Sequence, residues 1–359
     1  MLRRDRPPLS EIRAKRIALI KPSALGDIVH ALPVLHALRI RFPDAHLTWV
    51  VNRSFEPLLV GHPDLDATLP VDRQGMRQGL RQAATTIARL ARQLRRGRFD
   101  LVIDMQGLLR SGLMAAATGA ARRVGLGTCR EGSRHFYTDI VPTPHGMAEH
   151  AVDRHWRVAA AFGMGQLPKS FPVPIPGTAR DWVTIQLHDL PRPWLAFGVG
   201  ATWTTKRWPP ESFAVLARRA QARFGGSILF VGGPSETPLV RQVASDLVGP
   251  FRDFTGKTSL PQLAALLDRA DVMVSNDTGP LHLAAALGRP VVAPYLCTKS
   301  SRHGPYGSLN SAVESAVWCQ GSYIKKCDRL ECMSELHPDR LWNFLSEKLE
   351  TWSRRSRFA

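Results

Sequence analysis

The sequence predicts an α/β protein made of two doubly wound, Rossmann-like domains that face each other, each built on a parallel sheet. Three observations support this prediction: a length of 359 residues, an alternation of apolar runs with longer helical stretches, and a proline-rich segment near the middle. The length exceeds one ordinary hydrophobic core and fits two domains of about 150–180 residues each. Strands that alternate with helices are typical of parallel sheets.

In the first half, residues 16–20, 47–51 and 101–105 are short apolar runs rich in β-branched side chains, and we expect them to be strands. Residues 28–41 and 77–98 lie between these runs and have helical character. The second half repeats this rhythm. Its expected strands, each followed by a helical segment, are residues 194–199, 227–231, 272–275 and 291–293.

Residues 163–193 contain six prolines, which interrupt regular elements and suit an interdomain linker. We therefore predict a first domain over residues 1–175, a second over residues 176–335 and a terminal helix over residues 336–359. The apolar face of that helix needs a covering element, and it could pack back across the domain junction. This face consists of Leu341, Phe344, Leu345 and Leu349.

The charge of the chain favours an anionic partner. The protein has 48 basic and 30 acidic residues, and residues 1–170 alone hold 26 basic and 14 acidic ones. Nucleic acid, an anionic lipid surface and a phosphorylated glycan are the partners that such an excess fits. The helix expected over residues 77–98 has seven arginines and no acidic residue, which fits either an anionic membrane surface or a solvated helix face.

Residues 1–16 are basic but lack an apolar stretch of signal-peptide length, and no later run of about 18 apolar residues follows. We therefore expect a cytoplasmic protein. An odd number of cysteines argues against a secreted disulfide framework, and their spacing matches no strong zinc motif. The five cysteines, expected to be reduced structural thiols, are Cys129, Cys297, Cys319, Cys327 and Cys332.

Doubly wound sheets bind ligands beyond the carboxyl ends of their strands, so functional residues are expected in the loops that follow strands. Residues 16–20 lead into the sequence KPSALGD (residues 21–27) and then into a helix. Asp27 then lies at the helix start. Its carboxylate would cap the helix by accepting a backbone N–H, or act as a general base on a substrate hydroxyl. Both roles stay open from the residues alone.

The loop after residues 194–199 combines hydroxyl groups with a cation. Thr202, Thr204 and Thr205 can donate hydrogen bonds to phosphate oxygens, and Lys206 supplies positive charge for a diphosphate leaving group. A solvated loop is the alternative. After residues 227–231, Glu236 would accept hydrogen bonds from ribose hydroxyls or cap the next helix.

The best candidate anion site follows residues 272–275, where the sequence NDTGPLH opens a helix directly after a strand. Free N–H groups at a helix start can receive phosphate, and Gly279 permits close backbone approach. Asp277 would cap this helix or accept a hydrogen bond from a sugar hydroxyl. Thr278 belongs to the same turn, in which His282 is a packed or an orienting side chain. The only acidic pair of note, Asp64 and Asp66, is weak ground for a metal site, so no catalytic metal is expected.

Together these motifs resemble the lipopolysaccharide heptosyltransferases, and most of all the heptosyltransferase I group. The resemblance covers roughly residues 15–335. The segments that carry it are KPSALGDIVHALP (21–33), DMQGLLRS (104–111), REGSRHFY (130–137), HAVDR (150–154), KRWP (206–209) and DTGPLHLAAAL (277–287). At residues 296–302 the chain reads LCTKSSR, where the family usually has a glycine and a small polar turn.

This resemblance implies a glycosyltransferase B fold and a metal-independent, inverting transfer of heptose from ADP-L-glycero-D-manno-heptose to the Kdo region of the lipopolysaccharide inner core. Asp27 would be the general base, and Lys206 would neutralise the diphosphate. Thr202 and the turn of Asp277 would bind phosphates, and Glu236 the ribose. The residues expected to contact the acidic acceptor are Ser23, Gly26, Arg53, Arg110, Arg123 and Arg130.

The resemblance further implies no cofactor beyond the ADP-sugar substrate, and a glycolipid acceptor reached from the cytoplasmic surface of the inner membrane. It implies no nucleic-acid partner. Two alternatives from other classes remain: another nucleotide-sugar enzyme of the same fold, either a different glycosyltransferase or an epimerase, and a nucleic-acid-binding protein suggested by charge alone. The sequence has no recognisable nucleic-acid reading module.

Overall fold

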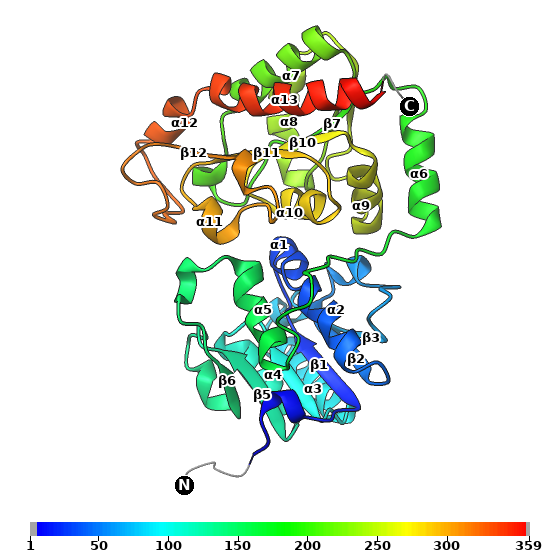
Figure 1. Ribbon diagram of the computed structural model, residues 1–359, viewed down its shortest axis with the longest axis vertical. Coiled ribbons are helices and arrows are strands. Elements are labelled where there is room, and N and C mark those ends of the chain that lie inside the picture. The colour runs from blue at the N-terminus through cyan, green and yellow to red at the C-terminus, as the bar shows by residue number, and fades with distance from the viewer. Residues whose placement is uncertain (1–5, 357–359) are drawn as a thin grey trace. The chain divides into compact units, whose positions relative to one another are not determined.

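The computed structural model describes residues 6–356, and the chain divides into two compact units, Met1–Pro174 and Ile175–Ala359. Each unit contains a six-stranded sheet with helices packed on it (Figure 1). The division falls inside the proline-rich segment. Among the described residues, no helix has both the length and the apolarity to span a bilayer.

The sheet of unit 1 is parallel throughout and has the strand order β3-β2-β1-β4-β5-β6. Strand order reverses between β1 and β4, which makes the carboxyl end of β1 the switch point where such folds bind ligands. The strands are β1 (Arg16–Ile20), β2 (His46–Asn52), β3 (Ala67–Val71), β4 (Leu101–Asp104), β5 (Arg122–Leu126) and β6 (Asp139–Val141).

Both faces of this sheet are covered. Ala18 and Ile20 of β1 share an apolar cluster with Leu90 and Leu94, and their neighbours in the strand point to the opposite face. Two pairs of helices pack on each other, α3 with α4 and α2 with α5. The helices of unit 1 are α1 (Leu25–Val29), α2 (Leu32–Arg41), α3 (Leu80–Arg96), α4 (Leu109–Ala117) and α5 (Ala151–Ala161).

The single helix expected over residues 28–41 is two helices, α1 and α2. The interruption lies just before Pro33, which occupies the second position of α2. Proline lacks an N–H and disfavours a helical conformation at the preceding residue, so it suits the first turn of a new helix better than a helix interior. The break leaves α1 as a short helix directly after the loop that follows β1.

Unit 2 repeats the architecture with the strand order β12-β11-β10-β7-β8-β9, and all its strand pairs are parallel. The strands are β7 (Trp194–Gly198), β8 (Ser227–Phe230), β9 (Phe251–Asp253), β10 (Val272–Ser275), β11 (Val291–Tyr295) and β12 (Ala312–Glu314). The switch point lies between β7 and β10. The loops expected to bind the donor follow these two strands.

The main helices of unit 2 are α6 (Gly177–Leu187), α7 (Pro210–Phe224), α8 (Thr237–Ala244), α9 (Leu260–Arg269), α10 (Gly279–Ala286) and α13 (Pro338–Ser356). Two shorter ones are α11 (Ser300–His303) and α12 (Glu331–Glu335). Helix α6 lies inside the segment that we expected to be an irregular linker. Pro176 lies immediately before the helix, which runs to Leu187 without a proline and packs against α9.

The terminal helix α13 packs on the core of unit 2. Leu341, Leu345 and Leu349, spaced four residues apart, are fully buried in a cluster that also contains side chains of β7, β8 and β10. The helix contacts α7, β10 and β11. These elements of unit 2 therefore cover the apolar face that we thought might reach across the domain junction.

Replacing Leu345 with alanine should lower the free energy of unfolding of unit 2 by about 2–5 kcal/mol, because the change leaves a cavity in a packed core. Glu347, exposed on the same helix, provides the control, and Glu347→Ala should change stability by no more than about 0.5 kcal/mol. Urea unfolding of both variants measures the difference. Equal effects would show that α13 contributes little to the core.

Candidate active site

The loop after β1 places Asp27 at the carboxyl edge of the unit 1 sheet. Asp27 is the third residue of α1, and its Oδ2 atom accepts a hydrogen bond from the backbone N–H of Ala24 over 3.0 Å. The carboxylate therefore does cap the helix. Its side chain is also 40% exposed, so solvent reaches the carboxylate.

A buried cation lies behind this carboxylate. Lys21 Nζ is 3.9 Å from Asp27 Oδ1 and donates a hydrogen bond to the Met105 carbonyl over 3.2 Å, and its side chain is only 5% exposed. Burial lowers the pKa of Lys21, while the charges of Asp27 and Asp104 act to raise it. Sequence reasoning gave Lys21 no role, although a lysine that directly follows a buried strand was a usable signal.

Helix α5 adds a buried imidazole to the same region. His155 Nδ1 lies 3.4 Å from the His30 carbonyl oxygen. Burial lowers the pKa of His155, and the positive charges of Lys21 and Arg154 lower it further. The ring is therefore neutral near pH 7, and the nearby positive charge belongs to Lys21 and Arg154.

Asp104, at the end of β4, shapes the neighbouring loop. It accepts hydrogen bonds from the backbone N–H groups of Gln106 (2.8 Å) and Gly107 (3.1 Å) and from the Tyr137 hydroxyl (2.6 Å). Burial raises the pKa of Asp104, and these donors oppose that rise. The DMQG and HFY segments thus meet at a buried carboxylate that holds a loop, and this contact was not foreseen from the sequence.

The predicted acceptor arginines fall into two groups. Arg53 follows β2, Arg110 begins α4 and Arg130 follows β5, and all three are exposed. The charge of Arg130 contributes to lowering the pKa of Lys21, so this arginine acts on the Asp27 region. Ser23 and Gly26 lie in the loop and first turn that carry Asp27, where Ser23 is partly exposed and Gly26 is buried.

Arg123 belongs to the second group and contacts the protein backbone. Its guanidinium donates hydrogen bonds to the carbonyls of Phe136 (2.7 Å) and Ala120 (2.6 Å). It is paired with Val102, two residues before the end of β4, so it sits away from the carboxyl edge. Arg123 holds neighbouring backbone in place, which sequence reasoning could not separate from ligand binding.

In unit 2, the structure joins two predicted motifs that are far apart in the sequence. Lys206 Nζ donates to Asp277 Oδ2 over 2.5 Å, and the two side chains are 20% and 4% exposed. Lys206 also lies 4.9 Å from the centre of the Trp203 ring. The cation expected to meet a diphosphate is therefore fixed beside the helix start expected to receive phosphate.

Asp277 is occupied by protein contacts. Besides Lys206, it accepts a hydrogen bond from Thr298 Oγ1 over 2.8 Å, and its Oδ1 lies 3.2 Å from His282 Nε2. Burial alone would raise the pKa of Asp277, but His282 and Lys206 outweigh it and hold the pKa well below its usual range. Asp277 is thus an ionised anchor for Lys206 and His282, and its role as a partner of sugar hydroxyls finds no support in these contacts.

The start of α10 remains open for an anion. Thr278 occupies the position before the helix, and its side chain does not cap the first turn. Asn276, fully buried, donates to the Val199 carbonyl over 2.9 Å and accepts from the Trp208 N–H over 3.0 Å. Asn276 thereby ties the loop after β7 to the start of α10, where Gly279 is the first helical residue.

The three threonines of the loop after β7 differ from one another. Thr205 is buried, and its hydroxyl donates to the Ile324 carbonyl over 2.6 Å. Thr204 makes a longer contact of 3.4 Å to the Lys325 carbonyl. Both hydroxyls contact residues 324–325, and Thr202 and Thr204 are exposed.

Glu236 lies at the carboxyl edge of the unit 2 sheet and makes a capping contact, one of its two expected roles. Its Oε2 accepts the N–H of Gly233 over 3.0 Å, which is a capping contact. A β-carbon added at Gly200 would lie 2.1 Å from the Glu236 carboxyl carbon, so a larger residue there would displace the Glu236 side chain. Burial raises the pKa of Glu236, and the Gly233 N–H and the charge of Arg207 oppose that rise.

Residues 6–356 contain no group of three or more His, Cys, Asp or Glu side chains placed to hold a metal ion. The chemistry visible in the two units consists of a half-exposed carboxylate with a buried cation behind it, and a partly exposed cation with a buried carboxylate behind it. The first can accept a proton, and the second can stabilise developing negative charge.

The fold matches that of solved glycosyltransferases. A family 9 glycosyl transferase from Veillonella parvula has a TM-score of 0.80 at 24% identity, covering 94% of this chain and 98% of its own. The E. coli heptosyltransferase WaaC with ADP has a TM-score of 0.70 at 26% identity, covering 93% and 99%. Two parallel doubly wound units of this kind make up the glycosyltransferase B fold.

Sequence comparison gives the family. The model of glycosyltransferase family 9 (heptosyltransferase) matches residues 87–333, and the chain belongs to this family. The chain is also 30% identical over 319 residues to lipopolysaccharide heptosyltransferase 1 of Pseudomonas aeruginosa, with 87% of each sequence covered. The family resemblance predicted from the motifs is confirmed.

Asp277→Asn should lower the free energy of unfolding by about 2–4 kcal/mol at pH 7, because it leaves Lys206 without its buried counter-charge. Because the pKa of Asp277 is depressed in the folded state, its stabilising effect is present above the ordinary aspartate pKa of about 4 and is lost as the pH falls further. Chemical unfolding at pH 7 and at pH 3 should thus show a smaller gap between wild type and variant in acid.

The control for this prediction is Asp246→Asn, which removes the partner of Arg218 in an ion pair whose side chains are 46% and 49% exposed. Exposed pairs contribute at most about 1 kcal/mol. If both substitutions cost the same at pH 7, burial of the Asp277 pair has no special weight.

Proposed function

We propose that the chain transfers heptose from ADP-L-glycero-D-manno-heptose to the Kdo region of a lipopolysaccharide precursor, with inversion and without a metal. The placement of Lys206 beside the start of α10 carries this proposal, because it provides a fixed positive site for a diphosphate. It is also supported by relatives named lipopolysaccharide heptosyltransferase 1 and by the similarity to E. coli heptosyltransferase WaaC with ADP.

In this proposal unit 1 binds the acceptor, and Asp27 is the general base. The acceptor oxygen attacks the anomeric carbon of the heptose as its proton passes to the Asp27 carboxylate. The bond from that carbon to the ADP oxygen breaks on the opposite side, which inverts the configuration. Lys21 Nζ, 3.9 Å from Asp27 Oδ1, lies beside the carboxylate that takes the proton.

Unit 2 binds the donor. Lys206 and the first-turn N–H groups of α10 stabilise the charge that develops on the leaving diphosphate. Thr202, an exposed residue of the loop, contacts a phosphate, while Glu236 accepts hydrogen bonds from the ribose. Because the leaving group meets fixed protein cations and dipoles, the reaction needs no metal and no further cofactor.

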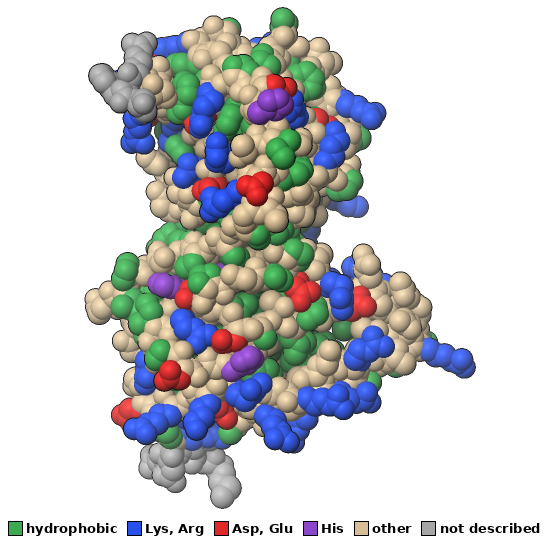
Figure 2. Space-filling model, turned by 90° about the vertical axis from the view of Figure 1, so that its right-hand side faces the viewer, with side chains coloured by type: hydrophobic (Ala, Val, Ile, Leu, Met, Phe, Trp, Pro, Cys, Tyr) green, Lys and Arg blue, Asp and Glu red, His purple; other side chains and the backbone are tan. Residues whose placement is uncertain are grey.

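The acceptor is an anionic glycolipid, which the protein meets as a peripheral protein on the cytoplasmic face of the inner membrane. Arg53, Arg110 and Arg130 are the exposed cations of unit 1 that would meet its acidic groups. Basic side chains are spread over the visible face of unit 1, with fewer acidic ones among them (Figure 2). This excess would concentrate an anionic substrate near the site.

Asp27→Asn should reduce the rate of heptose transfer by roughly 10²- to 10⁴-fold, because the amide cannot take up the acceptor proton. The asparagine oxygen can still accept the Ala24 N–H, but the buried Lys21 loses a nearby negative charge, so the thermal midpoint should fall while the protein stays folded at the assay temperature. ADP release from ADP-heptose with a Kdo-type acceptor gives the rate, and calorimetry with ADP should give an unchanged affinity.

Asp100→Asn is the matched control, since Asp100 also accepts backbone N–H groups, those of Lys15 and Arg16. These contacts lie at the amino end of β1, away from the proposed site. This variant should transfer heptose at close to the normal rate. Turnover by Asp27→Asn near the wild-type rate would eliminate Asp27 as the base.

Lys206→Met should weaken ADP binding by roughly 10- to 100-fold, as expected for the loss of one charge-assisted hydrogen bond to phosphate. Titration calorimetry measures this directly, and Lys206→Arg should recover part of the affinity. Lys257, 63% exposed in the same unit, provides the control, and Lys257→Met should bind ADP normally. Normal ADP affinity in Lys206→Met would contradict the proposed donor site.

A further inference from the structure

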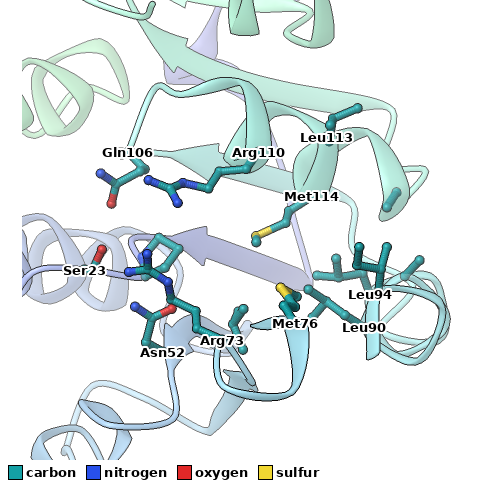
Figure 3. A pocket seen from close by; sticks show the side chains of 15 residues that line it. Ser23, Asn52, Arg73, Met76, Leu90, Leu94, Gln106, Arg110, Leu113 and Met114 are labelled. Atoms are coloured by element: carbon teal, nitrogen blue, oxygen red, sulfur yellow. The ribbon is translucent and has the colours of Figure 1, made fainter. Parts of the chain in front are cut away.

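Unit 1 contains a pocket that the proposed chemistry does not use in full. It lies between α3 and α4, next to the loop after β1, and has a volume of about 240 Å³. Figure 3 shows its two different ends. Ser23, Asn52, Arg73, Gln106 and Arg110 gather at one end, and the other is lined by Met76, Leu90, Leu94, Leu113 and Met114.

The apolar end is floored by buried side chains and has an open rim. Leu90 and Leu94 are 7% and 1% exposed, whereas Ile87 and Leu113 are 54% and 49% exposed. The volume exceeds that of an engineered apolar cavity of about 150 Å³ that stays dry and binds benzene. The space is therefore large enough for several carbons of an alkyl chain, which could enter past the rim.

The polar end has unused hydrogen-bonding capacity. Two side-chain oxygens at this end, Asn52 Oδ1 and Gln106 Oε1, are buried and have no hydrogen-bond partner among residues 6–356. Asn52 as a whole is only 4% exposed. A buried polar atom without a partner is costly, and a ligand at this end would satisfy it. Arg73 and Arg110 line the same end and make no ion pair with a described residue.

We infer that this pocket binds an acyl chain of the glycolipid acceptor, with an acidic group of the same molecule at Arg73 and Arg110. A free phosphate would leave the apolar end empty, and a neutral hydrocarbon would not use the arginines. A molecule with an anionic head and an alkyl tail satisfies both ends. That it is the acceptor rests on the proposed function and on the position of Ser23, four residues before Asp27.

The pocket would also make the protein selective among acceptors. Binding of the tail near the loop that carries Asp27 would favour acylated acceptors over soluble glycans with the same head. Each methylene buried in the pocket should increase affinity roughly fourfold. The increase should stop once the chain outgrows the pocket.

A direct test uses alkyl phosphates from ethyl to decyl, titrated into the full-length protein below their micelle concentrations. We expect affinity to rise roughly fourfold per methylene over the shorter chains and then to level off. Decanol should bind at least about tenfold more weakly than decyl phosphate, because it lacks the charge-assisted contacts. Affinity independent of chain length, or equal affinity for decanol, would overturn the inference.

Two substitutions of the same kind on α3 separate the pocket from the rest of the helix. Ala91 lines the pocket, whereas Ala88 lies on the exposed side and does not line it. Ala91→Trp should fill the apolar end and abolish the dependence on chain length, leaving the affinity for ethyl phosphate within about twofold of wild type. Ala88→Trp should behave as wild type. If both variants keep the dependence, the chain binds elsewhere.

Should Ala91→Trp fail to fold, Ala117→Phe in α4 fills the same pocket from the other side, and Ala116→Phe is its control.

A transfer assay separates this inference from the proposed function. In Ala91→Trp, transfer to a deacylated Kdo-type acceptor should stay normal while the advantage of the acylated acceptor falls at least about tenfold. Failure of wild type on both acceptors would refute the proposed function, whereas an unchanged advantage in Ala91→Trp would refute only the acyl-chain pocket.

Discussion

Parallel strand pairing is the constraint on which both units depend. In unit 1, Ile20 is paired with Val50 on one side and with Asp104 on the other, so β1, β2 and β4 reach the carboxyl edge at nearly the same level. The loops that follow these strands must then lie side by side. This register brings Ser23, Asn52 and Gln106 to one end of a pocket, and a slip by one residue would turn their side chains to the opposite face.

In both units a buried charged side chain lies next to a more exposed side chain of opposite charge, and the signs are reversed between the units. In unit 1 a buried lysine, Lys21, lies behind the half-exposed Asp27, and in unit 2 a buried aspartate, Asp277, lies behind the partly exposed Lys206. In each case a buried group of opposite charge lies next to the more exposed one. A buried charge without such a partner would cost several kcal/mol, which explains why the buried Lys21 and Asp277 each have an opposite charge close by.

Much of the fold could be predicted because periodicity and proline placement are local signals. The central strands β1, β7 and β10 were found because each is a continuous apolar run. The three-residue edge strands β6, β9 and β12 were missed, since they are too short to show a period. Helix α6 was missed because prolines on both sides of it masked a helical stretch.

The candidate site likewise has features that could be predicted from the sequence and features that could not. That Lys206 and the turn of Asp277 would serve one function could be inferred, because both follow strands that end at the same edge. The contact between them could not, because it depends on how far each loop folds back. Arg123 and Thr205 are the opposite case: their residue types suggest ligand binding, but tertiary structure uses their polar groups to hold neighbouring backbone.

Like Arg123, other basic side chains of unit 1 make contacts within the protein, which affects how the positive charge of this unit is interpreted. Arg122 forms an ion pair with Asp139, and Arg157 pairs with Glu149, so part of the basic composition stabilises the fold. The arginines left to meet a ligand are the exposed ones near the carboxyl edge, such as Arg110. Net charge therefore accounts for attraction of an anion at a distance, whereas recognition depends on a few side chains. Because Arg110 lies beside an apolar pocket, an amphiphile suits this part of unit 1 better than a simple anion does.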